Sequence, residues 1–400
     1  MDSDNPQQAG ATDLKSRLVK TAAYYAAFII LGLTGAVIGP TLPRLAEHTH
    51  TQLNQISFLF PASAFGYLLG SLLAGRLYDR LSGHRVLVTV LLVVAGALTL
   101  TPLASSIWVL TGILLVLNIC TGSIDVGGNT LLVWVHRDKV GPFMNALHFF
   151  FGVGAFLSPV IVAQVVSRTG EINLAFWIMA LASLPVAIWL IFLRSPKSIV
   201  ETGGEQKGPV SVFLVVLVAL FLFVYVGAEV GFGNWVFTYT RALDLADEAA
   251  AAYLTSAFWG ALTLGRLLSI PLAVRFSLRD VLIADLAGCL VSILVIVLFP
   301  SSLIALWVGT LGLGFAMAAI FPTTISLAER LLTLTGSITS YFFVGSSLGG
   351  MFLPWLIGQL FEPVGPQATM FAILGDLLAG VAVFALMMTS ARRSKVGATA

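Results

Sequence analysis

The sequence is dominated by long apolar segments that alternate with short polar stretches. Charged residues, Pro and Gly divide the chain into twelve such segments, each near the length of about 20 residues that a helix needs to cross the hydrocarbon core of a bilayer. The segments are 20–44, 53–78, 84–103, 106–135, 141–167, 172–194, 210–240, 249–274, 280–299, 302–328, 335–361 and 367–390. Strands of a membrane barrel are only about 9–11 residues long and do not account for them. The pattern therefore predicts an all-α membrane protein with twelve transmembrane helices.

The composition agrees with a chain that folds in lipid. Apolar residues make up 58% of the 400 residues and charged residues only 10%, and the mean hydropathy is +0.96, whereas a soluble domain carries about 25% charged residues. The net charge of +2 is too small to indicate nucleic acid. Cys120 and Cys289 lie in apolar segments, as packed thiols do, so we expect no disulfide, metal site or cofactor.

The basic residues gather on one side of the predicted membrane. Of the 21 Lys and Arg residues, 17 lie in the tails and in the loops near 76–85, 137–139, 194–207, 275–279 and 330. Only Arg44, Arg168 and Arg241 fall on the opposite side, and Arg266 falls within a segment. The positive-inside rule then places both termini in the cytoplasm, in a multi-pass protein of the plasma (inner) membrane. The first residues read as a polar tail and not as a cleavable signal peptide.

A weak internal repeat divides the chain into two halves. The polar linker 195–209 separates bundles at 20–194 and 210–391, with tails at 1–19 and 392–400. "GAFLSPVIVAQ" (154–164) resembles "GGMFLPWLIGQ" (349–359) at an offset of 195 residues, and the same offset relates Gly32 to Gly227 and Gly70 to Gly265 but pairs Gly112 with Trp307. Two parallel six-helix repeats around a midplane site describe a known transporter architecture.

Several motifs carry a family resemblance. "GRLYDRLSGHR" (75–85) between the second and third segments resembles the loop motif of the major facilitator superfamily, with one extra residue before its second glycine. "GSIDVGGNTLLVWV", "PFMNALHFFFGVGAFLSPVI", "YVGAEVGFGNWVFTY" and "GFAMAAIFPTTISLAE" are similar to its sodium-dependent glucose transporter-like group, which is related to the fucose/glucose:proton symporters. The resemblance implies the major facilitator fold, uptake of a monosaccharide with a cation, and a cytoplasmic gate at Gly75, Asp79, Arg80, Gly83 and Arg85.

Asp125 is the leading candidate for cation coupling. An acid in mid-membrane costs a few kcal/mol in lipid and should face protein or water. Asn118, Gly122, Asp125 and Asn129 recur at helical spacing on one face, where two amides and a carboxylate suit a hydroxylated ligand or a small cation. The alternative is a helix-packing stripe with one buried, hydrogen-bonded acid.

Glu229 is the second candidate, for coupling and for sugar binding. It lies in "YVGAEVGFGNW", where three glycines weaken a helix and predict a break that lines a cavity. Asn234 and Trp235 follow and offer amide groups and an apolar ring to a pyranose. The alternative is a flexible gate with a buried acid.

Further polar and aromatic residues extend the predicted sugar site, although each also has a packing interpretation. They are Asn145 and His148, Gln164 and its repeat partner Gln359, Trp259, Phe321 and Tyr341. Pro322 is expected to kink its segment. Arg266 and Asp285 lie at similar depth and are predicted to form a structural ion pair, whereas Asp376 has no evident partner.

The predicted function is transport of a glucose-like hexose by alternating access, coupled to H⁺ or Na⁺. The first segment carries no acid, so a sugar uniporter is an alternative, and a multidrug or lipid exporter or a transport-dead sensor are others. The chain has no Walker-type phosphate loop and no catalytic constellation, so ATP drive and enzymatic activity are not expected. We expect a monomer in the bilayer with a sugar substrate and no nucleic-acid partner.

Overall fold

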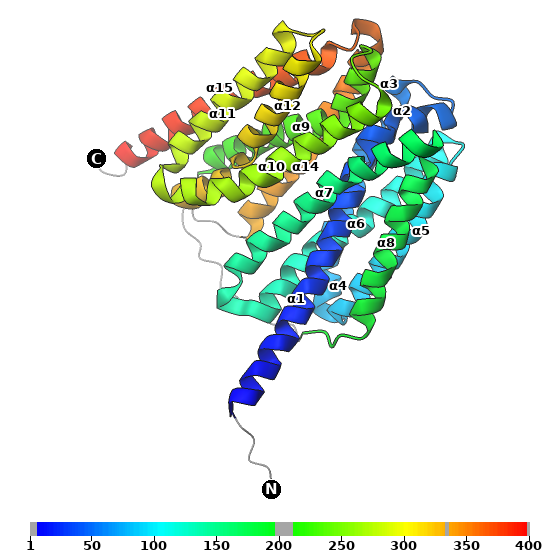
Figure 1. Cartoon of the computed structure of the whole chain (residues 1–400). Helices are drawn as coiled ribbons and strands as arrows, with labels where there is room; N and C mark the ends of the chain where they lie inside the picture. Colours follow the sequence, from blue (N-terminus) through cyan, green and yellow to red (C-terminus); the bar gives the residue numbers. More distant parts are fainter. Residues whose placement is uncertain (1–5, 197–210, 333–335, 398–400) are drawn as a thin grey trace.

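The computed structural model describes residues 6–196, 211–332 and 336–397, and all regular elements among them are helical (Figure 1). The first half contains α1 (Pro6–Ala36), α2 (Ile38–His48), α3 (Leu53–Ile56), α4 (Leu59–Arg80), α5 (Gly83–Leu100), η1 (Thr101–Leu103), α6 (Ile107–His136), η2 (Arg137–Lys139), α7 (Gly141–Thr169) and α8 (Asn173–Ile191). The second half contains α9 (Val212–Ala242), α10 (Glu248–Arg275), α11 (Leu278–Leu298), α12 (Leu303–Met317), α13 (Ile320–Leu331), α14 (Gly336–Val364) and α15 (Ala368–Gly397).

Eleven stretches in the described residues are long and apolar enough to cross a membrane. The twelfth predicted span, 249–274, is helical as α10 but is not among the eleven. Large apolar side chains such as Trp108, Phe192 and Ile304 are strongly exposed around the bundle, as lipid-facing residues are.

Helix boundaries differ from the predicted ones at several places. α1 begins at Pro6, so a helix covers most of the stretch predicted as a polar tail. The break between α12 and α13 falls at residues 318–319, in the turn before Pro322. Proline has no N–H for the helical hydrogen bond, and its ring would clash with the carbonyl one turn earlier. The break predicted at Gly227, Gly231 and Gly233 is wrong, because α9 is continuous.

The glycines of α9 instead serve helix packing, and they do so as the repeat predicts. In the first half a Cβ on Gly32 or on Gly154 would overlap the backbone of the other helix, so α1 and α7 pack in direct backbone contact. In the second half a Cβ on Gly227 would lie 3.3 Å from the carbonyl oxygen of Gly349, and one on Gly349 would overlap the carbonyl of Phe223. Gly227 and Gly349 lie 195 residues after Gly32 and Gly154, respectively. The repeat seen in the sequence is therefore also present in the helix packing.

A second pair of glycines repeats the same relation. A Cβ on Gly70 of α4 would overlap the carbonyl of Ile119 on α6. The equivalent Gly265 of α10 would bring a Cβ to 3.1 Å from the carbonyl oxygen of Phe315 on α12. The two halves are therefore built from the same helix pairs in the same order.

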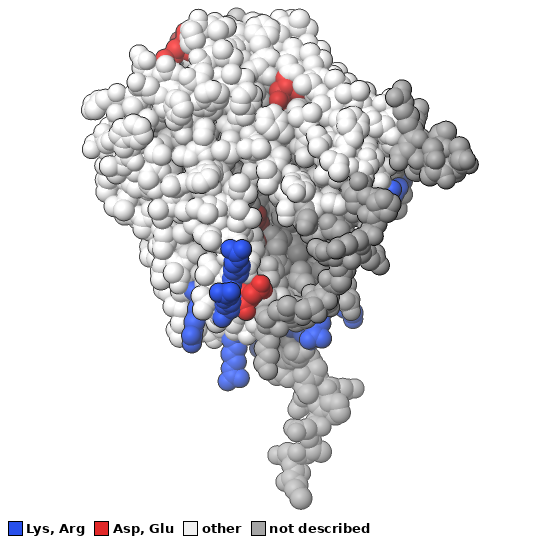
Figure 2. Space-filling model, turned by 180° about the vertical axis from the view of Figure 1, so that it is seen from behind, with Lys and Arg blue, Asp and Glu red and all other residues white. Residues whose placement is uncertain are grey.

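The two ends of the bundle differ in charge and in contact. We call the end formed by 76–85, 137–141 and 275–279 the basic end, and the end formed by 44–53, 168–173 and 241–248 the far end. In Figure 2 the Lys and Arg side chains gather in the lower part of the molecule, below a broad surface of other residues. In Figure 1 the ribbons of the two halves converge around α2, α3, α9 and α14 and diverge towards the two termini.

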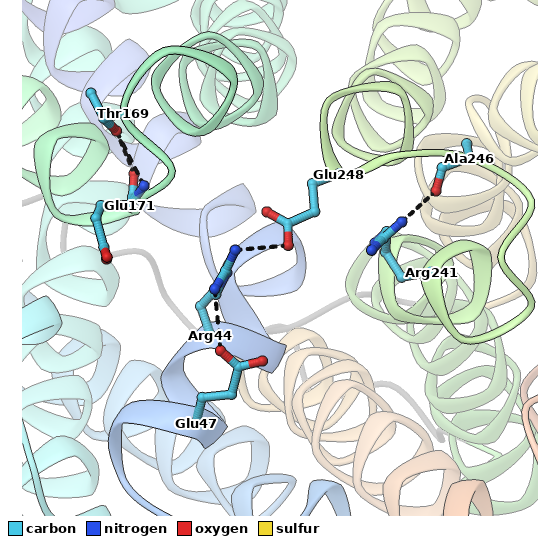
Figure 3. A network of polar contacts seen from close by, with 7 residues as sticks. All are labelled: Arg44, Glu47, Thr169, Glu171, Arg241, Ala246 and Glu248. Carbon is cyan, nitrogen blue, oxygen red and sulfur yellow. Dashed lines mark hydrogen bonds and ion pairs between the residues drawn. The ribbon is translucent and has the colours of Figure 1, made fainter.

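Polar contacts close the far end between the halves (Figure 3). Arg44 of α2 donates from Nη2 to Oε1 of Glu248 on α10 at 3.0 Å, and from Nη1 to Oε2 of Glu47 at 3.4 Å. Partial burial lowers the pKa of Arg44, but Glu248 and Glu47 outweigh it and hold the pKa above its usual value. The backbone amide of Leu53 also donates to Oε1 of Glu362 on α14 at 3.0 Å. The halves are therefore joined at this end.

Candidate functional site

Asp125, half-buried on α6, is held by two neutral donors. Its Oδ2 accepts a hydrogen bond from the hydroxyl of Tyr67 on α4, and its Oδ1 accepts one from the amide of Asn129 at 2.9 Å. None of the ion pairs among the described residues includes Asp125. The carboxylate is thus oriented and solvated by the protein, while its charge is left without a basic partner. Asn118 lies further along the same face, and its amide donates to the Leu114 carbonyl at 2.8 Å.

His148 on α7 lies near charged residues of both halves, Asp125 of the first and Arg266 of the second. Its side chain is exposed, and its ring meets the ring of Phe28 edge-on at a centroid distance of 5.8 Å. Asp125 of its own half and Arg266 of the opposite half both lie within electrostatic reach of the imidazole. Asn145, one turn earlier, is also exposed. His148 therefore marks where α6, α7 and α10 face one another.

Arg266 on α10 pairs with Glu229 on α9, so the predicted ion pair with Asp285 is wrong. The Arg266 Nη2 lies 3.7 Å from Oε1 of Glu229. Oδ2 of Asp285 is buried without a hydrogen-bond partner among the described residues, as is Oδ2 of Asp376. The prediction compared only depth along each helix. α10 packs mainly against α7, α9 and α12, whereas α11, which carries Asp285, packs against α12, α13 and α15.

Trp235 and Asn234 of α9 are occupied by packing contacts. Trp235 has no exposed surface, its indole N–H donates to the Pro354 carbonyl at 2.9 Å, and its ring lies 6.1 Å from that of Phe60 in the other half. The Asn234 amide donates to the Val230 carbonyl at 2.9 Å. In this conformation Trp235 therefore offers no free ring face to a sugar and helps to close the far end.

The two repeat-related glutamines, Gln164 and Gln359, both cross between the halves. Gln164 of α7 donates to the hydroxyl of Tyr253 on α10. Gln359 of α14 donates to the Asn54 carbonyl at 2.7 Å and to the Ser57 hydroxyl at 3.0 Å. Both contacts lie towards the far end, and the two amides join the halves there.

The predicted aromatic wall residues are placed differently from one another. Trp259 is buried against α9, and its indole nitrogen has no hydrogen-bond partner among the described residues. Phe321 is half-buried and lies 6.4 Å, centroid to centroid, from Tyr225. Tyr341 is 61% exposed on α14. Phe321 is thus the only one of the three that is neither enclosed nor largely exposed.

The gate motif lies at the basic end, at the junction of α4 and α5. Asp79, Arg80 and Arg85 are exposed there, and Gly75 has no atom within 4 Å of where a Cβ would lie. Gly83 is buried against the side chain of Leu131. The charged residues of the motif are therefore accessible at the surface of this end.

Sequence reasoning missed the residues that reach these groups from other helices. Tyr67, Tyr253 and Ser57 complete the contacts of Asp125, Gln164 and Gln359, and Glu248 completes that of Arg44. Each is a common residue that belongs to no local motif. The two tyrosines and the serine lie between 58 and 302 residues from their partners along the chain. No periodicity within one segment could have identified them.

Comparison with known proteins agrees with this architecture. A family model described as Major Facilitator Superfamily matches residues 24–354. The mouse protein named sodium-dependent glucose transporter 1A is 31% identical over 375 residues, covering 84% of this chain and 88% of its own length. Its human relative, sodium-dependent glucose transporter 1, is 30% identical with 84% and 72% covered. Mouse major facilitator superfamily domain-containing protein 4A is 27% identical, with 88% of each chain covered.

A solved structure extends the comparison to the fold. The nucleoside transporter NupG superposes with a TM-score of 0.74 at 14% sequence identity, covering 94% of this chain and 99% of the other. At that identity the likeness concerns the fold alone. Together with the eleven membrane-spanning helices, these similarities make the chain an integral, multi-pass membrane protein.

Proposed function

We propose that this chain, which belongs to the Major Facilitator Superfamily, carries a glucose-like hexose across the membrane by alternating access, coupled to H⁺ or Na⁺. Relatives at about 30% identity that are named as glucose transporters support the sugar. The observation that carries the coupling is Asp125, a carboxylate held by Tyr67 and Asn129 and in none of the ion pairs of the described part of the chain. A cation would supply the missing charge.

The arrangement of the halves supports a two-state cycle. Contacts at the far end, including Arg44 with Glu248 and Gln359 with Ser57, would break when that end opens. The predicted gate residues Asp79, Arg80 and Arg85 would then meet partners as the basic end closes. With the basic end in the cytoplasm, as the distribution of Lys and Arg favours, the conformation described here is closed to the outside.

Binding of sugar and cation together would drive the exchange of states. A ligand shifts such an equilibrium only by binding one state more tightly than the other. Closing the halves around a charged Asp125 would bury an unpaired carboxylate, which is unfavourable in a medium of low dielectric constant. A cation bound at Asp125 removes this penalty, which couples its entry to that of the sugar.

The test is counterflow and gradient-driven uptake of labelled D-glucose in proteoliposomes, comparing wild type with Asp125→Asn. Counterflow needs no ion gradient, so it isolates sugar binding and the change of state. We expect both proteins to exchange glucose and only wild type to concentrate it under an imposed H⁺ or Na⁺ gradient. Asp285→Asn, which removes an intramembrane acid outside the site, is the matched control and should still concentrate glucose.

The outcomes separate the possibilities. Wild-type protein that exchanges neither glucose nor any of a panel of hexoses would contradict the sugar assignment. Wild-type protein that exchanges glucose but gains no accumulation from either gradient would be a uniporter, and the role of Asp125 would then be structural.

A further inference from the structure

We propose that Glu229 makes the site selective for uncharged sugars, because it neutralises Arg266 and so prevents an anionic sugar from binding there. The inference rests on the proposed function and adds to it a residue that determines specificity. It also changes the role predicted for Glu229 from the sequence, from a residue for cation coupling and sugar binding to one that determines specificity.

The Arg266–Glu229 pair lies where the two halves face each other. A Cβ on Gly152 of α7 would overlap the side chain of Thr263 on α10, so these helices touch at that level. His148 precedes Gly152 by about one turn and Arg266 follows Thr263 by about one turn. Because α7 and α10 run in opposite directions, both residues lie on the basic-end side of the contact. The electrostatic interaction between His148 and Arg266 agrees with this placement.

Within the pair, the arginine is the more accessible partner. The Arg266 side chain is 27% exposed and the Glu229 side chain 12%. Their separation of 3.7 Å is longer than a hydrogen bond, and guanidinium carries five N–H donors in a planar fork. Arg266 therefore keeps donors for a ligand hydroxyl while the less exposed Glu229 balances its charge.

The charges at this place explain the selectivity. Asp125 and Glu229 each contribute −1 and Arg266 contributes +1, so with His148 neutral the sum is −1, which one bound cation brings to zero. A sugar carboxylate would add a further negative charge and would have to compete with Glu229 for Arg266. Arginine binds carboxylates in a bidentate geometry, so a hexuronate would be the natural ligand of an unmatched Arg266. Only the presence of Glu229 prevents this.

The experiment measures selectivity as a ratio, so that a general loss of activity cancels. Counterflow of labelled D-glucose is inhibited with unlabelled D-glucose or with D-glucuronate, and the two half-inhibitory concentrations are compared. We expect wild type to discriminate strongly against glucuronate and Glu229→Gln to reduce the glucuronate-to-glucose ratio at least tenfold. The double variant Glu229→Gln/Arg266→Gln should restore the wild-type ratio, and the methyl ester of glucuronate should inhibit wild type and Glu229→Gln alike.

Two further variants keep the test decisive. Glu248→Gln removes a glutamate that also pairs with an arginine, Arg44, but at the far end, and its ratio should equal that of wild type. Arg266→Gln leaves Glu229 unpaired, so the glucuronate-to-glucose ratio of half-inhibitory concentrations should be higher in this variant than in wild type. For variants that bind without transporting, the same ratio is read from protection of the purified protein against thermal unfolding.

The outcome that overturns the inference is clear. If Glu229→Gln binds glucose with the wild-type ratio, Glu229 is a structural residue and selectivity arises elsewhere. Failure of wild type to bind any hexose contradicts the proposed function instead, so the two failures are distinguishable.

Discussion

The two oxygens of Asp125 are occupied by donors of different origin. Asn129 comes from the next turn of the same helix, and its donation to Oδ1 follows from helical spacing. Tyr67 comes from α4, and its hydroxyl occupies Oδ2. A cation that takes the lone pair of Oδ2 to which this hydrogen bond is made would displace the hydroxyl hydrogen. Tyr67 is therefore a positioning residue that also competes with the cation.

Tyr67→Phe should strengthen cation binding. A hydrogen bond to a charged group contributes about 1.5–3 kcal/mol, and roughly 1.4 kcal/mol corresponds to a tenfold change in a binding constant. We expect the half-saturating cation concentration for glucose uptake to fall about tenfold, while glucose counterflow without a gradient persists. Tyr78→Phe is the control, since that hydroxyl, also on α4, donates to the Ser123 carbonyl at 3.1 Å. An equal shift in both variants, or none in Tyr67→Phe, would contradict this role.

At the scale of single residues, the sequence predicts what one helix determines and not what two helices determine. Asn129 could be placed beside Asp125 because both lie on α6. Tyr67, and Glu229 as the partner of Arg266, could not, because the rotation of each helix about its axis decides which side chains meet. That rotation depends on packing over the whole bundle.

At the scale of elements, glycines set how closely the helices approach. Gly154 and Gly349 occupy equivalent positions in α7 and α14, and at both a methyl group would overlap a backbone carbonyl, of Ile29 and of Phe223 respectively. Since a backbone cannot turn aside as a flexible side chain can, the helices would have to separate. Close packing of small residues takes the place that the hydrophobic effect has in water.

Gly349→Ala should destabilise the protein. Overpacking costs about 1–3 kcal/mol, so we expect the melting temperature in detergent to fall by a few degrees, measured through thiol labelling of the buried Cys120 and Cys289. Gly375→Ala, on α15 with no atom within 4 Å of the added methyl group, should be neutral or slightly stabilising because alanine favours a helix. A Gly349→Ala protein as stable as the Gly375→Ala protein would show that α9 and α14 can separate freely.

The segments and the repeat could be predicted from the sequence because they are periodic. Except for the first, where α1 runs from Pro6 to Ala36, the apolar runs gave the outer bounds of most spans to within a few residues, and the offset of 195 residues correctly related Gly32 to Gly227 and Gly70 to Gly265. The continuity of α9 could not be predicted, because Gly227, Gly231 and Gly233 weaken an isolated helix but favour a closely packed one. Propensity and packing act in opposite directions there, and packing prevails.

At the scale of the whole molecule, the halves are joined at the far end by contacts that a moving transporter must break. Gln164 binds Tyr253, and Gln359 binds Asn54 and Ser57. These amides are polar groups at an otherwise apolar interface, so losing them affects the balance between the two states more than the fold of either half.

The double variant Gln164→Ala/Gln359→Ala should open the far end. With spin labels on cysteines introduced at the exposed residues Glu171 and Asp244, one in each half, we expect the distance distribution to gain a longer component. Gln55→Ala is the control, since its side chain accepts from the Gln52 backbone amide within the same half at 3.0 Å. An unchanged distribution in the double variant would assign the closure to Arg44, Glu248 and the packing of Trp235 instead. Which end is closed could not be read from the sequence, since both states share every residue.

Gln164 and Gln359 are equivalent residues of the repeat, so their contacts also bear on how the two halves of the chain are related. Tyr253, minus the offset of 195 residues, corresponds to Phe58, the neighbour of Ser57. The two hydrogen bonds are thus related contacts, from the fifth long helix of each half to the second segment of the other, at Tyr253 on α10 and at Ser57 just before α4. In a two-fold dimer of identical subunits every interface contact occurs twice in this way. The far end of this single chain thus shows the two-fold relation that gene duplication and fusion of one six-helix unit would leave.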